Sequence, residues 1–184
     1  MDWHSLLFDH WPIKFVSIVL VVAYVIDARG LRVPNWITFP LALSGIAFHT
    51  ISHGLPGLGF ALIGLFLGLA TLLPLYAVGG MGAGDVKLMA GAGAWIGGAL
   101  IIDSFIAIAL VGGLMALVMV VISGGWRHHV RLAGVILREV VTLRDPRKMF
   151  DSALERKPTM LLLPYGIPVC IGAITTFLHH GLLV

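Results

Sequence analysis

Apolar residues fill most of this chain in long runs, which are separated by short polar or glycine-rich stretches. Six runs stand out, at residues 11–28, 35–52, 58–78, 86–102, 104–123 and 160–183. A helix needs about 20 mostly apolar residues to cross the hydrocarbon core of a bilayer, and the runs approach that length. The pattern therefore predicts an all-α, polytopic membrane protein with about six transmembrane helices.

Composition supports a membrane location. Hydrophobic residues make up 59% of the 184 residues and charged residues only 11%, against roughly 25% charged in an ordinary soluble domain. We expect one membrane domain over residues 1–184, with the first run retained as a span because it shows no Ala-x-Ala-like cleavage site. The single cysteine, Cys170, excludes an internal disulfide and a Cys-x-x-Cys zinc site.

Basic residues are sorted by connection. If six spans alternate in direction, eleven of the twelve Lys and Arg residues fall on one side and only Lys14 falls on the other. The basic side is expected to face the cytoplasm, which places both termini outside. The net charge of +3 then reflects topology, and we expect no nucleic-acid partner.

The segment 126–143 mixes basic and apolar residues and is too charged to span a bilayer. We expect a cytoplasmic helix lying in the membrane interface, between the fifth and sixth spans and within a loop at 126–158. A role in docking substrate is the alternative interpretation of this segment.

Two aspartates lie at the ends of apolar runs. Asp27 closes the first run and Asp85 precedes the fourth, and both fall near the cytoplasmic side at the same depth. Ionisable groups at such positions are costly and are functional candidates. Two carboxyl groups held close together can share one proton, which is the chemistry of an aspartyl protease.

Asp85 ends a stretch with four glycines in residues 79–84. Each glycine weakens a helix by about 1 kcal/mol relative to alanine, so irregular backbone is expected there. The alternative interpretation is an interhelical loop in which Asp85 merely caps the next helix and pairs with Lys87. Three Gly-x-x-x-Gly spacings, starting at Gly64, Gly80 and Gly93, predict close helix packing.

Two further blocks flank apolar runs. Gly30 and Pro34 predict a turn after Asp27, and Asn35 is placed to cap the second helix. Pro164-Tyr165-Gly166 opens the last run and interrupts helical hydrogen bonding. A kinked helix start is the alternative interpretation of that last block.

Taken together, these blocks resemble the type IV prepilin peptidases, a family of GxGD-type intramembrane aspartyl proteases. The resemblance covers about residues 15–175 and implies that Asp27 and Asp85 are catalytic. It implies that the other matched positions shape the site or bind substrate: Pro34, Asn35, Gly82, Gly84, Lys87, Pro164, Tyr165 and Gly166. One aspartate would act as general base on a water and the other would polarise the scissile carbonyl, in an order left open because a coupled pair titrates as a unit.

The resemblance implies cleavage of the leader peptide of type IV prepilins at the cytoplasmic face of the bacterial inner membrane. The chain looks like the short form associated with Flp-type, tight-adherence pili, because it lacks the paired Cys-x-x-Cys motifs of the long form. Methylation of the new N-terminus is left open. We expect prepilins and the lipid bilayer as partners and no metal or other cofactor, since the adjacent pairs His128-His129 and His179-His180 are poor chelators.

Two other functions remain open from the residues alone. A proton-coupled transporter could use both aspartates to carry protons, although such proteins are expected to show inverted repeats with charges at the midplane. A non-enzymatic membrane assembly protein could keep the glycine-rich motif for packing. The cognate prepilin and the oligomeric state are not determined by the sequence.

Overall fold

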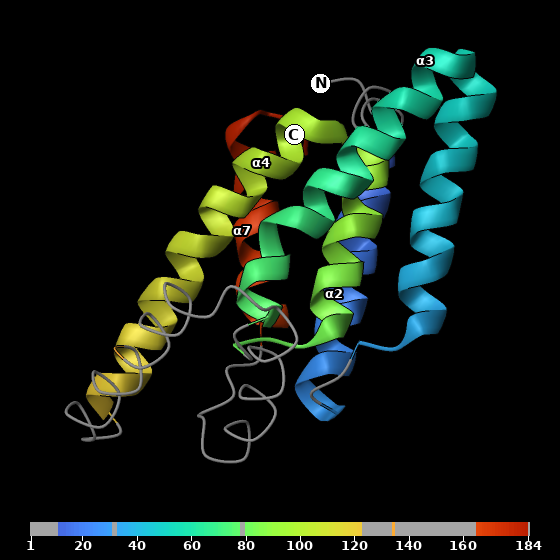
Figure 1. Cartoon of the computed structure of the whole chain (residues 1–184). Coiled ribbons are helices and arrows are strands. Elements are labelled where there is room, and N and C mark those ends of the chain that lie inside the picture. The colour runs from blue at the N-terminus through green and yellow to red at the C-terminus, as the bar shows by residue number, and fades with distance from the viewer. Residues whose placement is uncertain (1–10, 31–32, 78–79, 123–133, 135–164, 184) are drawn as a thin grey trace.

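The computed structural model describes residues 11–30, 33–77, 80–122, 134 and 165–183 (Figure 1). Four helices account for nearly all of them: α2 at Trp11–Gly30, α3 at Asn35–Ala77, α4 at Ala83–Ile122 and α7 at Gly166–His179. The described part of the chain contains no strand, so the all-α prediction is confirmed. The interfacial helix expected at 126–143 and the loop 126–158 lie outside the described residues, apart from Gly134.

The two long helices each reverse direction at a glycine. Gly54 in α3 (φ 62°) and Gly97 in α4 (φ 79°) have positive φ values that side-chain-bearing residues rarely adopt. Figure 1 shows both helices turning back at the same end of the molecule. Each is therefore a pair of antiparallel segments, at 35–53 and 55–77 in α3 and at 83–96 and 98–122 in α4.

The position of the second reversal corrects one predicted boundary. The break was expected near Asp103, where the run of apolar residues pauses, but the helix continues through that residue. The chain turns at Gly97 instead, because only glycine accommodates this φ and because the ring of Phe60 fills the space where a side chain would stand. Asp103 forms a partly exposed hydrogen bond with His180.

With α2 and α7, the fold presents six apolar helical segments that alternate in direction (Figure 1). Helices α3 and α4 are long and apolar enough to cross a membrane, judged by length and composition. Large apolar side chains face outward on several segments, among them Ile18, Ile51, Phe66 and Leu110. An outward apolar surface suits a lipid environment. The count of six spans stays a prediction.

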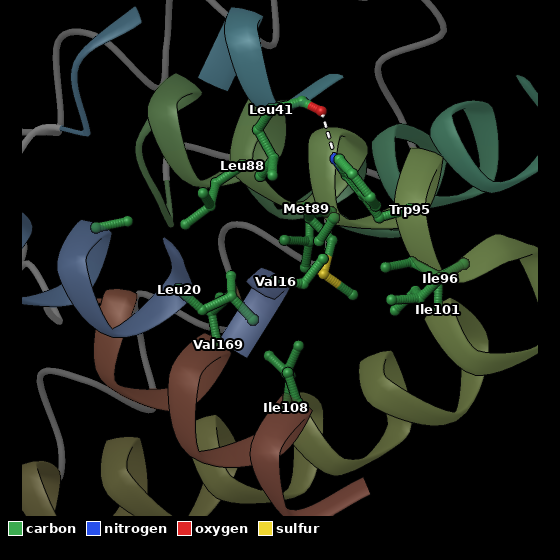
Figure 2. Close-up of a cluster of buried hydrophobic side chains, with 14 of the residues drawn as sticks. Val16, Leu20, Leu41, Leu88, Met89, Trp95, Ile96, Ile101, Ile108 and Val169 are labelled. Carbon is green, nitrogen blue, oxygen red and sulfur yellow. Dashed lines mark hydrogen bonds between the residues drawn. The ribbon is translucent and has the colours of Figure 1, made fainter. Parts of the chain in front are cut away.

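Glycine contacts hold α3 against α4. A side chain at Gly64 would collide with the backbone of Gly93, and one at Gly68 would collide with the backbone of Met89. The close packing predicted for these two Gly-x-x-x-Gly motifs is confirmed. The indole of Trp95 adds a 2.9 Å hydrogen bond to the Leu41 carbonyl, and both residues belong to the core cluster shown in Figure 2.

Helix α7 packs against α4 and α2 and brings the end of the chain back to the middle of the bundle. Gly172 lies directly on Ile108 of α4, while Val169 joins Val16 and Leu20 of α2 in the core. The helix begins at Gly166, inside the predicted run 160–183, and residues 160–164 lie outside the described part. This packing sets Tyr165 and Gly166 beside the end of α2.

Candidate active site

Both predicted aspartates are buried at one end of the bundle. Asp27 lies in the last turn of α2 and is 4% exposed, and Asp85 lies in the first turn of α4 and is 5% exposed. The charge of Asp27 acts on the carboxyl of Asp85, so the two groups lie within electrostatic range of each other. Residues 58 positions apart in the sequence thus form one acidic pair.

Asp27 is held by the start of α7. The C-terminal turn of its own helix is an unfavourable place for an anion, because helix polarity is negative there. The backbone N–H of Gly166, the first residue of α7, donates to Asp27 Oδ2 at 3.2 Å. Such N–H groups at a helix start have no partner within the helix and favour negative charge. The structure thereby connects Asp27 and the turn that follows it with the Pro164-Tyr165-Gly166 block.

A side chain at position 166 would crowd this contact. A Cβ atom there would stand 2.8 Å from Asp27 Oδ2 and 3.2 Å from Asp27 Cβ, both closer than ordinary contact. The backbone approaches the carboxyl because nothing projects from Gly166. Close approach to the aspartate, rather than a kinked helix alone, accounts for this residue.

Asp85 does cap its own helix, as one interpretation of the sequence proposed. Its Oδ2 accepts the N–H of Gly82, the residue that precedes α4, at 3.3 Å. This is one half of a capping box. The other oxygen, Oδ1, is buried and has no hydrogen-bond partner among the described residues. A carboxyl that served only as a cap would gain by exposing that oxygen to water, because a buried unpaired acceptor is costly.

Lys87 does not pair with Asp85. Its Nζ donates to Asn35 Oδ1 at 3.0 Å and lies 5.3 Å from the centroid of the Phe39 ring. Asn35 is the first residue of α3, and its side-chain oxygen reaches across to α4. The hydrogen bond joins the turn that follows Asp27 to the helix that follows the glycine-rich stretch.

Gly84 reinforces the same junction. A Cβ at this position would stand 2.8 Å from the carbonyl oxygen of Val33 and 3.0 Å from its nitrogen. The space in which a side chain at position 84 would stand is therefore occupied by Val33. Pro34 follows Val33, and its carbonyl accepts the N–H of Ile37 at 3.1 Å in the first turn of α3.

Tyr165 connects the acidic pair to a cavity. The charge of Asp85 acts on the Tyr165 hydroxyl, and the same residue forms one wall of an apolar cavity of about 200 Å³. The remaining walls come from the end of α3 and the second segment of α4: Leu72, Leu75, Phe105, Ile108, Ala109, Gly112, Gly113 and Ala116. Sequence reasoning missed these residues, since an apolar residue that lines a cavity has the same pattern as one that faces lipid or core.

Of the ten residues expected at the site, the structure gathers nine at this end of the bundle, and Pro164 lies outside the described residues. Within the described ranges, no three or more His, Cys, Asp or Glu side chains are grouped so as to hold a metal ion. What the arrangement offers chemically is an acid pair, with a backbone N–H on each carboxyl and one carboxyl oxygen that no described residue contacts by a hydrogen bond.

The described residues form an apolar helical bundle with a buried acid pair at one end. The model of the type IV leader peptidase family matches residues 14–120, more than half of the chain and a stretch that contains both aspartates. The chain belongs to that family.

Individual relatives agree with this assignment. The chain is 33% identical over 118 residues to a prepilin leader peptidase/N-methyltransferase of Aeromonas hydrophila, covering 60% of this chain and 39% of that protein. It is 38% identical over 111 residues to the protein of the same description in Neisseria gonorrhoeae, covering 56% of this chain and 37% of that one. The chain thus spans about two fifths of the length of these curated relatives. No solved structure matches it.

Proposed function

We propose that this protein is an aspartic endopeptidase that removes the leader peptide from type IV prepilins, with Asp27 and Asp85 as its catalytic residues. One observation carries the proposal above the others: two carboxyl groups from separate helices are buried at the same end of the bundle, and Asp85 Oδ1 has no partner in the described part of the chain. A carboxyl oxygen in that state can bind a reacting water or a substrate carbonyl.

The pair performs hydrolysis with one shared proton. The ionised carboxyl takes a proton from water as the water oxygen bonds to the scissile carbonyl carbon, and the protonated carboxyl donates a hydrogen bond to the carbonyl oxygen. When the C–N bond breaks, the leaving amine takes up a proton from the pair, which restores the starting state. The N–H groups of Gly82 and Gly166 stabilise the ionised form of whichever carboxyl carries the charge.

The cavity beside Tyr165 supports a substrate with an apolar segment. Its lining is almost entirely apolar, and the Tyr165 hydroxyl at its edge lies within electrostatic range of Asp85. We propose that it receives the apolar part of the prepilin next to the cleaved bond. Flp-type pilins are the proposed substrate class, following the resemblance to the short form. Methyl transfer, which the names of the relatives include, has no residue assigned to it here.

We further propose that residues 1–184 form one domain of the bacterial inner membrane, with the loop 126–158 in the cytoplasm. The sorted basic residues support this orientation. In it the acid pair faces the cytoplasm, where a basic leader would remain while the apolar segment lies in the bilayer.

Replacing each aspartate by asparagine tests the function. We expect Asp27→Asn and Asp85→Asn each to slow conversion of prepilin to mature pilin in membranes by about 10²- to 10⁴-fold, because general acid–base catalysis contributes that much. Asp103→Asn is the matched control, since Asp103 is about half exposed and its side-chain partner among the described residues is His180. Normal conversion by either site variant excludes the aspartyl mechanism. It would then favour a role in transport or assembly.

Cysteine labelling tests the orientation. In a Cys170→Ser background, Ser5→Cys and Ser52→Cys should react with an impermeant maleimide in intact spheroplasts, whereas Ser152→Cys should react only after lysis. The expectation rests on the asymmetry of basic residues. Labelling of Ser152→Cys in intact spheroplasts would show the inverted orientation, in which the acid pair cannot meet a cytoplasmic leader.

A further inference from the structure

The turn between α2 and α3 is seated on the first turn of α4 at two points. Val33 is buried, and its backbone lies against Gly84 closely enough that a Cβ there would collide with it. Two residues further on, Asn35 Oδ1 accepts a hydrogen bond from the Lys87 ammonium at 3.0 Å. These two contacts bracket Asp85, which lies between Gly84 and Lys87 in the same helical turn.

The same turn follows Asp27 by only six residues. The hydrogen bonds of the two carboxyls run elsewhere, from Asp27 to α7 and from Asp85 to its own helix start. Neither of those bonds fixes the separation between the aspartates. Helices α2 and α4 also pack against each other and against α7, and the contacts of Val33 and Asn35 add a connection to α4 next to Asp85.

We propose that the Val33–Asn35 turn is a positioning brace, which holds Asp27 and Asp85 at the separation needed to share a proton. Gly84, against which Val33 packs, is the seat of this brace. The Asn35–Lys87 hydrogen bond, which joins the turn to α4, is its fastening. Asn35, Gly84 and Lys87 are positioning residues in this account and do not contact substrate. The proposal rests on the proposed function, because a brace for proton sharing has a purpose only in an acid-pair enzyme.

The Lys87 ammonium is directed away from the acid pair, which favours a shared proton. An ammonium in contact with a carboxylate favours its ionised form, and two carboxyls that are both ionised cannot hold the shared proton. The Asn35 oxygen and the Phe39 ring provide Lys87 with polar and cation–π partners away from Asp85. The fastening therefore joins α3 to α4 and directs the Lys87 ammonium toward Asn35 and Phe39 instead of Asp85.

A double-mutant cycle tests the fastening. We expect Asn35→Leu and Lys87→Met each to lower kcat by about tenfold or more, because small displacements of catalytic groups have large effects on rate. KM should stay within about threefold, since neither residue touches substrate. The double variant should be no slower than the slower single variant within about twofold, as expected for partners in one interaction. Lys87→Arg, which keeps the donor, should restore most of kcat.

Gly84→Ala tests the seat, with Gly59→Ala as its matched control. A Cβ at Gly84 meets the Val33 backbone, whereas one at Gly59, in α3, meets no atom within 4 Å. We expect Gly84→Ala to lose kcat by at least about tenfold and Gly59→Ala to keep it. The exposed pair Asp103 and His180 also joins two helices, and Asp103→Asn provides the control for loss of a helix-to-helix hydrogen bond remote from the site.

A direct measurement of separation keeps the brace testable independently of activity. Asp27→Cys and Asp85→Cys, combined in a Cys170→Ser background, should cross-link with short bifunctional thiol reagents. The same pair should require longer reagents when Asn35→Leu or Lys87→Met is added. The brace is overturned if Asn35→Leu and Lys87→Met leave the required reagent length unchanged and keep kcat within about twofold of wild type. It is also overturned if Lys87→Arg fails to restore the activity that Lys87→Met loses. If the wild type does not cleave prepilin, the proposed function fails, and the cross-linking result still decides the brace.

Discussion

Gly166→Ala is the most informative single substitution at the site, because it disturbs one aspartate without removing it. The added Cβ would stand 2.8 Å from Asp27 Oδ2, which is 0.6 Å short of the 3.4 Å at which ordinary contact begins. The close atoms belong to the aspartate itself, so the carboxyl must move or the start of α7 must withdraw. Either movement lengthens the 3.2 Å hydrogen bond from the Gly166 N–H.

The structure predicts that Gly166→Ala lowers kcat strongly but lowers the free energy of unfolding only slightly. A shift of about half an ångström at a catalytic carboxyl should lower kcat about tenfold or more. Weakening a hydrogen bond to a charged group costs about 1.5–3 kcal/mol, while alanine in place of glycine within a helix returns about 1 kcal/mol. Stability should therefore fall by only about 0.5–2 kcal/mol. A large loss of rate with a small loss of stability is the signature of misplacement.

The assay is conversion of prepilin by purified protein in detergent, with thermal unfolding followed in the same preparation. Gly59→Ala makes the same chemical change in open space and should leave kcat unchanged. If Gly166→Ala cleaves at the wild-type rate, Asp27 is not held by α7 in the active protein, and the assignment of Gly166 to the site is wrong.

Two further predictions concern the shared proton and the fold. Cleavage should show a bell-shaped pH dependence, because rate is lost at low pH when both carboxyls are protonated and at high pH when both are ionised, and EDTA should leave the rate unchanged. Inhibition by EDTA that a divalent ion reverses would indicate a metalloprotease instead. Gly97→Val should lower stability by about 2 kcal/mol or more, since φ is 79° there and the Phe60 ring fills the space of a side chain. An unchanged thermal midpoint would contradict the reversal at Gly97.

The helical segments followed from sequence because burial in lipid and packing both require long apolar runs. Where the chain reverses inside a run was harder to predict. The pause in hydropathy at Asp103 suggested a break, yet the helix passes through it and turns at Gly97. A charged residue near a helix end can be satisfied locally, as Asp103 is by His180, whereas a positive φ strongly favours glycine. With several glycines in the run at 91–98, the sequence did not distinguish which one would turn.

The candidate site divides in a similar way. The two aspartates could be identified from sequence, because a carboxyl at the end of an apolar run stands out against its neighbours. Lys87 was ambiguous, since its nearest acid in sequence is Asp85, but its partner is Asn35, 52 residues away. Asp85 was interpreted either as a helix cap or as a reactive carboxyl, and the structure has a feature of each. One of its oxygens caps α4, and the other is left without a partner among the described residues.

By itself, the sequence determined which carboxyl groups are candidates for chemistry and that the apolar runs are helical. It also determined on which side of the membrane the site is predicted to lie. These properties depend on residue type and local pattern. Tertiary structure decided which groups meet. The N–H that reaches Asp27 comes from Gly166, 139 residues later, and it arrives there because α7 packs between α2 and α4. The physical reason is that hydropathy and helix propensity act over a few turns, whereas the meeting of two distant backbones depends on how all the side chains between them pack.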